Sequence, residues 1–355
     1  MEIDTIQCLL KEDCIGCGAC MNRCPVNCIS MRGDKEGFLY PAVNAGKCIK
    51  CGRCKAVCPI LTHLSYDGTN PSCYAAWSKD PDIRFNSTSG GVFTHLAQLI
   101  LQQNGYVVGA RYRADHLVEH IMISSENELE ELRQSKYVQS EVGSTFQEIE
   151  LQLSKGKIVL FAGTPCQCAG LRTFLGREYD DLYLCDFICR GVNSPAVYQQ
   201  YLRDLEKQYG APVKRVWFKN KTYGWNRFCT KIIFENGQEY LADRETDPFM
   251  LGYIKSRLSL YMRPTCYHCQ FKGVSRPVDI TLGDFWGIEK QYPYIDIHDG
   301  VSLVLVQSQK GEKLFHSVLN CCTVHLADLE GAVANNICMC QSVKTGVKTN
   351  IVVGQ

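Results

Sequence analysis

Residues 14–25 read CIGCGACMNRCP, and residues 48–59 read CIKCGRCKAVCP. In both stretches the cysteines follow the spacing Cys-x2-Cys-x2-Cys-x3-Cys, and a proline follows the last cysteine. Four thiolates at this spacing suit the four irons of a cubane, because each iron takes one soft sulfur ligand from the protein. The two runs therefore predict two 4Fe–4S clusters and decide the fold of the N-terminal part of the chain.

In this spacing, which is typical of bacterial ferredoxins, three cysteines of a run bind one cluster and the fourth binds the other. We predict one cluster at Cys14, Cys17, Cys20 and Cys58, and the other at Cys24, Cys48, Cys51 and Cys54. Zinc is the alternative, since Cys-x2-Cys pairs also form zinc ribbons. Because a zinc ion takes only four ligands and does not require two complete runs, the spacing favours iron–sulfur clusters.

Composition narrows the possible functions. The chain has 355 residues, a formal net charge of +1 and no long basic stripe, so we do not expect nucleic-acid binding. No apolar run approaches the ~20 residues of a membrane span, and residues 1–4 lack the basic region of a secretory signal. We expect a reducing cytoplasm, where thiols stay free to bind iron. The two runs use eight of the 22 cysteines and leave fourteen, enough for a further cluster.

The pattern of apolar and polar residues predicts four parts. These are a ferredoxin-like α+β domain at 1–62, a polar linker at 63–72, a mixed-sheet α/β domain at 73–330 and a tail at 331–355. In the second domain we predict helices at 90–103, 126–133, 145–154 and 194–208. We predict strands at 28–30, 38–43, 106–110, 158–162, 182–188, 213–219, 230–235, 279–282 and 302–307.

Six short motifs after the linker resemble one known family. They are STSGG at 87–91, SKYVQS at 135–140, GTPCQ at 163–167, DFICRG at 186–191, RPTCYHC at 263–269 and GDFWG at 283–287. In this order they resemble the beta subunits of coenzyme F420-reducing hydrogenase and formate dehydrogenase, a family that plant 7-hydroxymethyl chlorophyll a reductase also resembles. The resemblance implies FAD and a further 4Fe–4S cluster. It does not specify the substrate, because members reduce very different molecules.

The residues fit a third cluster independently. Cys166 and Cys189 each follow a predicted buried strand, and the carboxyl ends of strands are where α/β proteins place ligands. A Cys-x2-Cys pair lies further along, so we predict the ligands Cys166, Cys189, Cys266 and Cys269. Zinc at the same thiolates is one alternative. Another alternative is that Cys168 or Cys185 replaces one of these ligands, although we interpret both as packing residues.

For FAD, Ser89, Gly90 and Gly91 open a predicted helix, whose N-terminal N–H groups and dipole suit a pyrophosphate. No Gly-x-Gly-x-x-Gly stretch opens a strand–helix unit, so a Rossmann fold is disfavoured. The other residues that we predict to line the cofactor crevice are Lys136, Tyr137, Gln139, Ser140, Gly163, Thr164, Asp284, Phe285 and Trp286. An exposed loop at 136–140, an N-cap role for Asp284 and a core position for Trp286 remain alternatives.

These parts predict an iron–sulfur flavoenzyme. Ferredoxin or a similar carrier would exchange single electrons with the N-terminal clusters, and FAD would exchange two electrons with a small-molecule substrate, in either direction. One alternative names coenzyme F420 as the substrate, and another is a non-catalytic electron-transfer subunit of a larger complex. The chain could also form a homo-oligomer. Arg190 stands where the family pattern has histidine, so a titratable group is replaced by a permanent cation that suits an anionic substrate.

Overall fold

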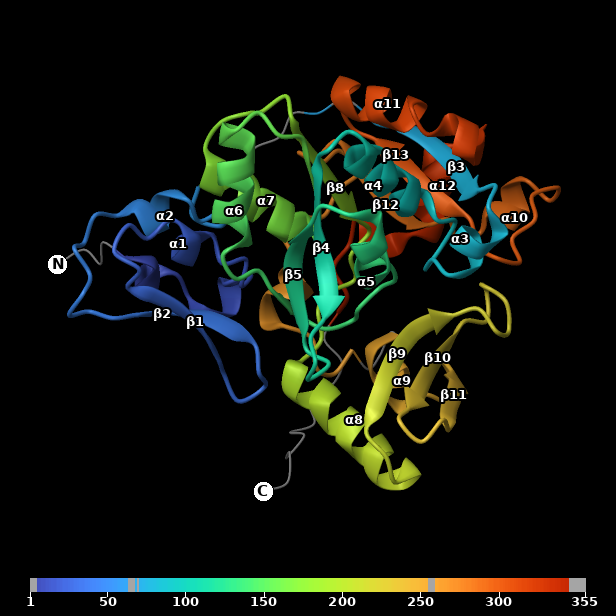
Figure 1. The fold of residues 1–355 in the computed structure, drawn as a ribbon, viewed down its shortest axis with the longest axis horizontal. Helices are drawn as coiled ribbons and strands as arrows, with labels where there is room; N and C mark the ends of the chain where they lie inside the picture. Colours follow the sequence, from blue (N-terminus) through green and yellow to red (C-terminus); the bar gives the residue numbers. More distant parts are fainter. Residues whose placement is uncertain (1–4, 63–67, 69, 255–258, 345–355) are drawn as a thin grey trace.

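The computed structural model describes residues 5–62, 68, 70–254 and 259–344. The first of these ranges forms a small module at one end of the molecule (Figure 1), and most of the predicted linker lies outside the described residues. Strands β1 (Ile29–Gly33) and β2 (Leu39–Val43) pair antiparallel, close to the predicted strands. The remaining elements are η1 (Ile6–Cys8), η2 (Lys11–Asp13), α1 (Ala19–Asn22) and α2 (Arg53–Ala56).

Both short helices of the module lie inside a cysteine run. Gly18 precedes α1 at φ 74° and Gly52 precedes α2 at φ 70°. This left-handed conformation is open to glycine without a side-chain clash, so each run can turn sharply after its second cysteine. The turn brings the cysteines of a run onto one short loop.

A nine-stranded mixed sheet forms the centre of the described structure, in the order β14-β3-β13-β12-β8-β7-β4-β5-β6. Strands β12, β8, β7 and β4 are parallel neighbours, and antiparallel strands flank them on both sides. The bounds are β3 Ser72–Ser78, β4 Tyr106–Tyr112, β5 Val118–Ile123, β6 Ser140–Glu141, β7 Val159–Ala162, β8 Leu182–Phe187, β12 Ile280–Asp284, β13 Ser302–Val306 and β14 Cys322–Leu326. The predicted mixed-sheet α/β fold is confirmed.

Helices cover both faces of this sheet, since adjacent residues of a strand point to opposite sides. Val107 packs in the cluster formed with α4, α5 and α11, whereas Val108 packs in the cluster formed with α6 and α7. The N-terminal module joins the second cluster through Cys17, Ala19 and Val57. The helices are α3 Pro81–Phe85, α4 Val92–Gln102, η3 Glu126–Glu128, α5 Leu129–Leu132, α6 Thr145–Ser154, α7 Pro165–Leu175, α10 Ile288–Gln291, α11 Gln309–His316, η5 Leu319–Cys321, α12 Leu329–Asn335 and η6 Ile337–Met339.

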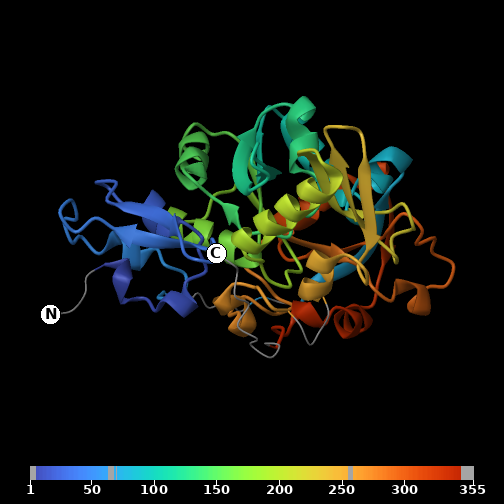
Figure 2. The same ribbon diagram turned by 90° about the horizontal axis from the view of Figure 1, so that it is seen from below.

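A second, three-stranded sheet lies away from the N-terminal module (Figure 2). It has the order β11-β10-β9, with bounds β9 Val213–Asn220, β10 Cys229–Phe234 and β11 Glu239–Asp243. Helices α8 (Pro195–Tyr209) and α9 (Pro248–Ile254) share an aromatic core with it, and η4 (Pro264–His268) follows. Helix α8 begins as predicted, since the side chain of Ser194 caps it and proline is its first residue.

Several elements were not predicted. Strand β3 begins at Ser72, the last residue of the predicted linker, and helix α7 begins directly before Cys166. Helix α12 spans residue 331, where we predicted a tail, and Ala332 packs in the core with Phe285 and Leu303. Strands β5 and β11 were also missed. The strands among these segments are short, so their structure depends largely on packing against the sheet, whereas α7 has local signals in its capping box and in the proline at its start.

Candidate electron-transfer and cofactor site

The first set of predicted ligands, Cys14, Cys17, Cys20 and Cys58, comes together in the N-terminal module. Burial raises the pKa of Cys17 well above its usual value, and the charges of the other three thiolates raise it further. The pKa of Cys20 is likewise raised by burial and then by its neighbours Cys14 and Cys58. Each thiolate makes the ionisation of its neighbours less favourable, so all four can be ionised together only around a cationic centre. The irons of a cubane would supply that centre.

The second set, Cys24, Cys48, Cys51 and Cys54, lines one pocket, as the crossed assignment of the two runs requires. A fifth thiol, Cys28, lies in the same pocket, with its Sγ 3.4 Å from that of Cys24. The backbone N–H of Cys28 also donates to Cys24 Sγ at 3.3 Å. We had not singled out Cys28, although its place four residues after Cys24 was a signal. Hydrogen bonds to cluster sulfurs tune reduction potentials, so Cys28 is suited to that role.

The third set, Cys166, Cys189, Cys266 and Cys269, lines another pocket, with about 670 Å³ of empty space. Cys166 lies in the first turn of α7, Cys189 follows β8, and the last two belong to η4 and its C-cap. Burial raises the pKa of Cys166 to about 12, and the charge of Cys269 adds to this. Within the described ranges, no three or more His, Cys, Asp or Glu side chains are arranged for a single metal ion.

The two alternative cysteines do not line this pocket. Cys168 is fully buried with its Sγ 3.9 Å from the carbonyl of Gly163, and Cys185 is buried within β8. Both pack as we interpreted them. Four cationic side chains do line the pocket, and they would offset the negative charge of a cluster held by four thiolates: Arg190, Arg263, Lys272 and Arg276.

The first and third sets are neighbours. Ile15 and Gly16, which lie between Cys14 and Cys17, line the pocket of the third set. The guanidinium of Arg263 donates to the carbonyl of Cys14 at 2.7 Å and is 1% exposed. On the other side, a Cβ built on Gly170 of α7 would lie 2.8 Å from Cys17 Cβ. The loop of the first set therefore touches both the N-cap of η4 and helix α7.

Segments of three separate motifs lie close together near the third set, and we call the region between them the predicted cofactor crevice. The hydroxyl of Thr88 donates to Ser135 Oγ at 3.1 Å, which joins the loop before α4 to the loop that carries Lys136. Lys221, which directly follows β9, donates to the carbonyl of Ser89 at 2.7 Å. Tyr137 is close enough to both Asp284 and Cys189 for their charges to raise its pKa, although burial is the larger cause. The predicted crevice therefore lies near the loop of Cys189.

Lys136 is half-buried and does not lie on an exposed loop. Burial lowers its pKa to about 7. Its ammonium donates to the carbonyl of Arg133 at 2.7 Å and lies 5.6 Å from the ring centroid of Tyr112. Burial, helped by the charge of Lys136, lowers the pKa of His120 to about 4.

Two unsatisfied polar atoms lie near the segment of Lys136 and Tyr137. His120 Nδ1 and Asn193 Oδ1 are buried, and neither has a hydrogen-bond partner among the described residues. Native proteins rarely leave such atoms unpaired, because each costs about 1–3 kcal/mol. A bound molecule with several polar groups would satisfy them. The residues of the crevice therefore fit a large polar cofactor such as FAD.

Asp284, another predicted cofactor residue, forms an ion pair that aromatic rings cover. Lys219 donates to Asp284 Oδ2 at 2.5 Å, and Trp225 Nε1 donates to Oδ1 of the same carboxylate at 3.0 Å. Trp286 stacks on Trp225 with ring centroids 4.6 Å apart, and Lys219 lies 4.7 Å from the Trp286 centroid. Burial lowers the pKa of Lys219 although Asp284 opposes this. Asp284 is thus an ion-pair partner of a buried lysine and not an N-cap.

The remaining predicted cofactor residues hold together the elements around the site. Thr164 caps α7 and lies 3.1 Å from Cys166 Sγ, and Ser140 accepts a hydrogen bond from Gln167. Gln139 accepts from Arg263, and the N–H of Gly163 donates to the carbonyl of Cys185. Ser89, Gly90 and Phe285 are buried. A Cβ on Gly90 would lie 2.3 Å from a carbonyl of β3. Gly91 is the N-cap of α4 and has a left-handed backbone conformation. Any contact of these residues with FAD stays a prediction.

The contacts of three cations near the site could not be predicted from the sequence. Lys219 and Lys221 face inward at the end of β9, where a Lys-x-Lys pair after an apolar strand was the only signal. Arg190 lines the third pocket, but its guanidinium donates to the carbonyls of Tyr253 and Ile254 and to Ser259 Oγ. These bonds tie Arg190 to the end of α9, so it positions the loop of Cys189.

Comparisons with known proteins agree with this site. The model of the coenzyme F420 hydrogenase/dehydrogenase beta subunit N-terminus matches residues 73–147, the corresponding C-terminal model matches 156–331, and a 4Fe–4S dicluster domain matches 13–60. The chain therefore belongs to the coenzyme F420 hydrogenase/dehydrogenase beta subunit family, preceded by a dicluster ferredoxin-type module. It is an iron–sulfur protein of an oxidoreductase family. No curated protein matches it.

A solved structure shares the fold. It is a chain of the F420-reducing [NiFe] hydrogenase complex from Methanosarcina barkeri, similar at a TM-score of 0.50 and 17% identity, over 77% of this chain and 93% of that one. At this identity the likeness concerns the fold alone. No helix of the described residues is both long and apolar enough to cross a membrane.

Proposed function

We propose that this chain transfers electrons between a ferredoxin-type one-electron carrier and a small molecule that exchanges two electrons, with three 4Fe–4S clusters and FAD as its cofactors. The observations that carry the proposal are the pocket of the third set, which the predicted cofactor residues Gln139, Ser140 and Thr164 also line, and the half-buried Lys136 in the same segment of the chain. Bound FAD would supply the conversion between single electrons and hydride transfer.

The residues of the crevice have distinct parts in this proposal. Lys136, as an ammonium, would attract the pyrophosphate, and the unpaired atoms of His120 and Asn193 would bind polar groups of the cofactor. Trp286, held by its stack on Trp225, would give the ring system an apolar wall. Tyr137 and Tyr253, whose ring centroids are 5.3 Å apart, would exclude water between the crevice and Cys189.

Two alternatives follow from the family. Coenzyme F420 would be the two-electron partner if this chain shares the substrate in the family's name, and an F420 absorbance assay separates that outcome from other substrates. The related chain belongs to a hydrogenase complex, so this chain could instead act only as a subunit. Turnover by the isolated protein with reduced methyl viologen would contradict a purely non-catalytic role.

Anaerobic purification with iron, sulfide and flavin quantified per chain tests the proposal. We expect about twelve irons and one FAD, since each cubane holds about four irons. About eight irons would remove the third cluster. A preparation that neither contains nor takes up FAD would overturn the flavoenzyme proposal while leaving the clusters in place.

A further inference from the structure

The second set of thiols lies closest to solvent. Of the twelve predicted ligand cysteines, all within the described residues, only Cys51 is exposed. The first set, by contrast, faces the third pocket through Ile15 and Gly16. A carrier protein in solution therefore reaches the second cluster most directly, and the first cluster lies between it and the third.

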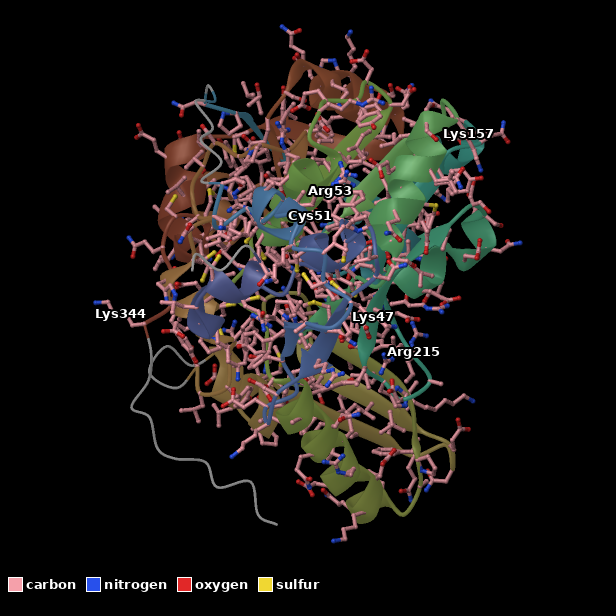
Figure 3. The ribbon with its side chains drawn as sticks, turned by 90° about the vertical axis from the view of Figure 1, so that its left-hand side faces the viewer. Lys47, Cys51, Arg53, Lys157, Arg215 and Lys344 are labelled. Atoms are coloured by element: carbon pink, nitrogen blue, oxygen red, sulfur yellow. The ribbon has the colours of Figure 1, made fainter. Side chains whose placement is uncertain are left out.

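The surface around Cys51 is basic. Residues 44–62 contain Lys47, Lys50, Arg53 and Lys55 and no acidic residue. The first three are exposed, and none of the four is in an ion pair with any residue that the structure describes. Figure 3 looks onto this side of the molecule, with Cys51 and Arg53 next to each other and Lys47 on the same side.

Apolar side chains border the same pocket. Val26 is 37% exposed and Ile49 is 61% exposed, and both line the pocket of the second set. Together with Cys51, Lys47, Lys50 and Arg53 they form what we call the Cys51 face. A small apolar centre with a charged rim is the usual composition of a transient protein interface, and redox encounters bury little area.

We propose that the Cys51 face is the docking surface for a small acidic one-electron carrier protein, a refinement that rests on the proposed function. Each encounter moves one electron: the reduced carrier is oxidised and the second cluster is reduced, and two encounters supply the pair that the substrate needs. The basic rim attracts the acidic surface of the carrier and orients it, which raises the association rate more than the lifetime of the complex. The apolar centre lets the two redox centres approach closely.

The test compares charge variants of the full-length holoprotein. The triple variant Lys47→Glu/Lys50→Glu/Arg53→Glu reverses the rim, and Lys47→Arg/Lys50→Arg/Arg53→Lys keeps its charge. The matched control, Lys207→Glu/Lys214→Glu/Lys313→Glu, reverses three exposed cations that lie on α8, β9 and α11. Iron content is measured for each, and the double variant Lys47→Glu/Lys50→Glu replaces the triple if the triple loses iron.

An acidic plant-type [2Fe–2S] ferredoxin is the probe. We measure its binding in the oxidised state and its rate of reducing the N-terminal clusters, from about 0.02 M to about 0.5 M salt. We expect wild-type affinity and rate to fall at least about tenfold over this range, and the reversed variant to lose at least about tenfold at low salt and to lose the salt dependence. The charge-preserving variant and the control should match wild type within about twofold.

Equal losses in the remote control, or binding by the reversed variant that matches wild type, would overturn the proposal. A shifted cluster potential with unchanged ferredoxin binding would also overturn it, because the cations would then only balance cluster charge. If ferredoxin binding were insensitive to salt while reduced viologen still drove substrate reduction, the docking surface would be contradicted and the proposed function would stand. If cluster reduction by ferredoxin were sensitive to salt in a protein without flavin, the proposed function would be contradicted and the docking surface would stand. A permanent subunit or a second copy covering Cys51 in solution, detected by the mass of the purified protein, would also contradict the proposal.

Discussion

Buried lysines distinguish the crevice from an ordinary protein interior. Lys221 is 1% exposed and donates to three carbonyls, of Arg84, Ser89 and Asp299. Among the residues that the structure describes, Lys136 donates to two carbonyls, at 2.7 and 3.3 Å, which leaves one N–H for a ligand. An ammonium has three N–H donors. Lys221 uses all three in hydrogen bonds to the backbone, whereas Lys136 has one N–H left to donate to an anion.

Replacing Lys136 by Met should weaken FAD binding at least about tenfold, because a charge-assisted hydrogen bond is lost. The pH dependence provides the sharper test. The pKa of Lys136 is about 7 in the protein without ligand, and an anion would raise it. Affinity should therefore be constant below that pKa and fall as the pH rises above it, by up to about tenfold per unit. Fluorescence titration of flavin-free protein measures this.

The variant Lys136→Met should show weaker binding without this pH dependence. The variant Lys155→Met, which removes an exposed lysine at the C-cap of α6, is the control and should bind FAD like wild type. Wild-type affinity that stayed constant from pH 6 to about pH 9 would contradict a phosphate-binding role for Lys136.

Substitution of Cys266 by Ser should lower the iron content from about twelve to about eight per chain, because one cubane loses a ligand. Cys168→Ser is the control, since that thiol packs beside the site without lining the pocket. Iron and sulfide analysis with electron paramagnetic resonance checks both variants. Unchanged iron in the Cys266 variant would show that this thiol is not a ligand.

At the scale of single elements, helix α7 joins two redox sites. Its N-terminus carries Cys166 and is capped by the reciprocal hydrogen bonds of Thr164 and Gln167, and Gly170 in the middle of the helix lies against Cys17. Further along, Thr173 donates to the carbonyl of Val57 at 2.8 Å. The helix is thus anchored to the N-terminal module along its length, and a shift of α7 would move the ligands of both clusters.

Replacing Gly170 by Ala tests this role. The added methyl would lie 2.8 Å from Cys17 Cβ and 2.9 Å from its Sγ, too close for either atom to stay in place. We expect a loss of about 1–3 kcal/mol in the free energy of unfolding, as for other overpacked sites, and an altered signal from the first cluster. Thermal unfolding and electron paramagnetic resonance measure these changes.

Gly46→Ala is the matched control, because its nearest neighbour would be a side-chain atom 3.5 Å away and its backbone does not require glycine. If both alanine variants unfolded at the same temperature as wild type, α7 would not be tightly fitted against Cys17.

For the molecule as a whole, the proposal arranges the three sets of thiols as a series. The second set is nearest to solvent at Cys51, the first borders the third pocket, and Tyr137 is close to both Cys189 of the third set and Asp284. Arg263 holds the module in this arrangement. It donates to the carbonyls of Cys14 and Leu39 and to Gln139, and its guanidinium lies 4.2 Å from the ring centroid of Tyr40.

Arg263→Met should therefore destabilise the protein by about 3 kcal/mol or more, since hydrogen bonds to a charged group are worth about 1.5–3 kcal/mol each. It should also slow electron transfer from the N-terminal clusters to the third one. Chemical denaturation and rapid-freeze spectroscopy measure the two effects. The control Arg113→Met removes half-exposed ion pairs to Asp115 and Glu141 and should cost no more than about 1 kcal/mol. Equal costs for both variants would contradict the bridging role.

The sequence by itself predicted the role of the two cysteine runs, the bends at the glycines inside them and the cap of α8. These features depend on residue spacing and backbone preference within a few residues. The apolar runs at β7 and β8 likewise predicted buried strands with ligands at their ends. Only the tertiary structure brought Lys219 to Asp284 and Lys221 to the carbonyl of Ser89, turned Arg190 toward α9, and made Cys51 the most exposed of the predicted ligands. Burial and charge neighbours depend on contacts between distant segments, and no local pattern of residues encodes them.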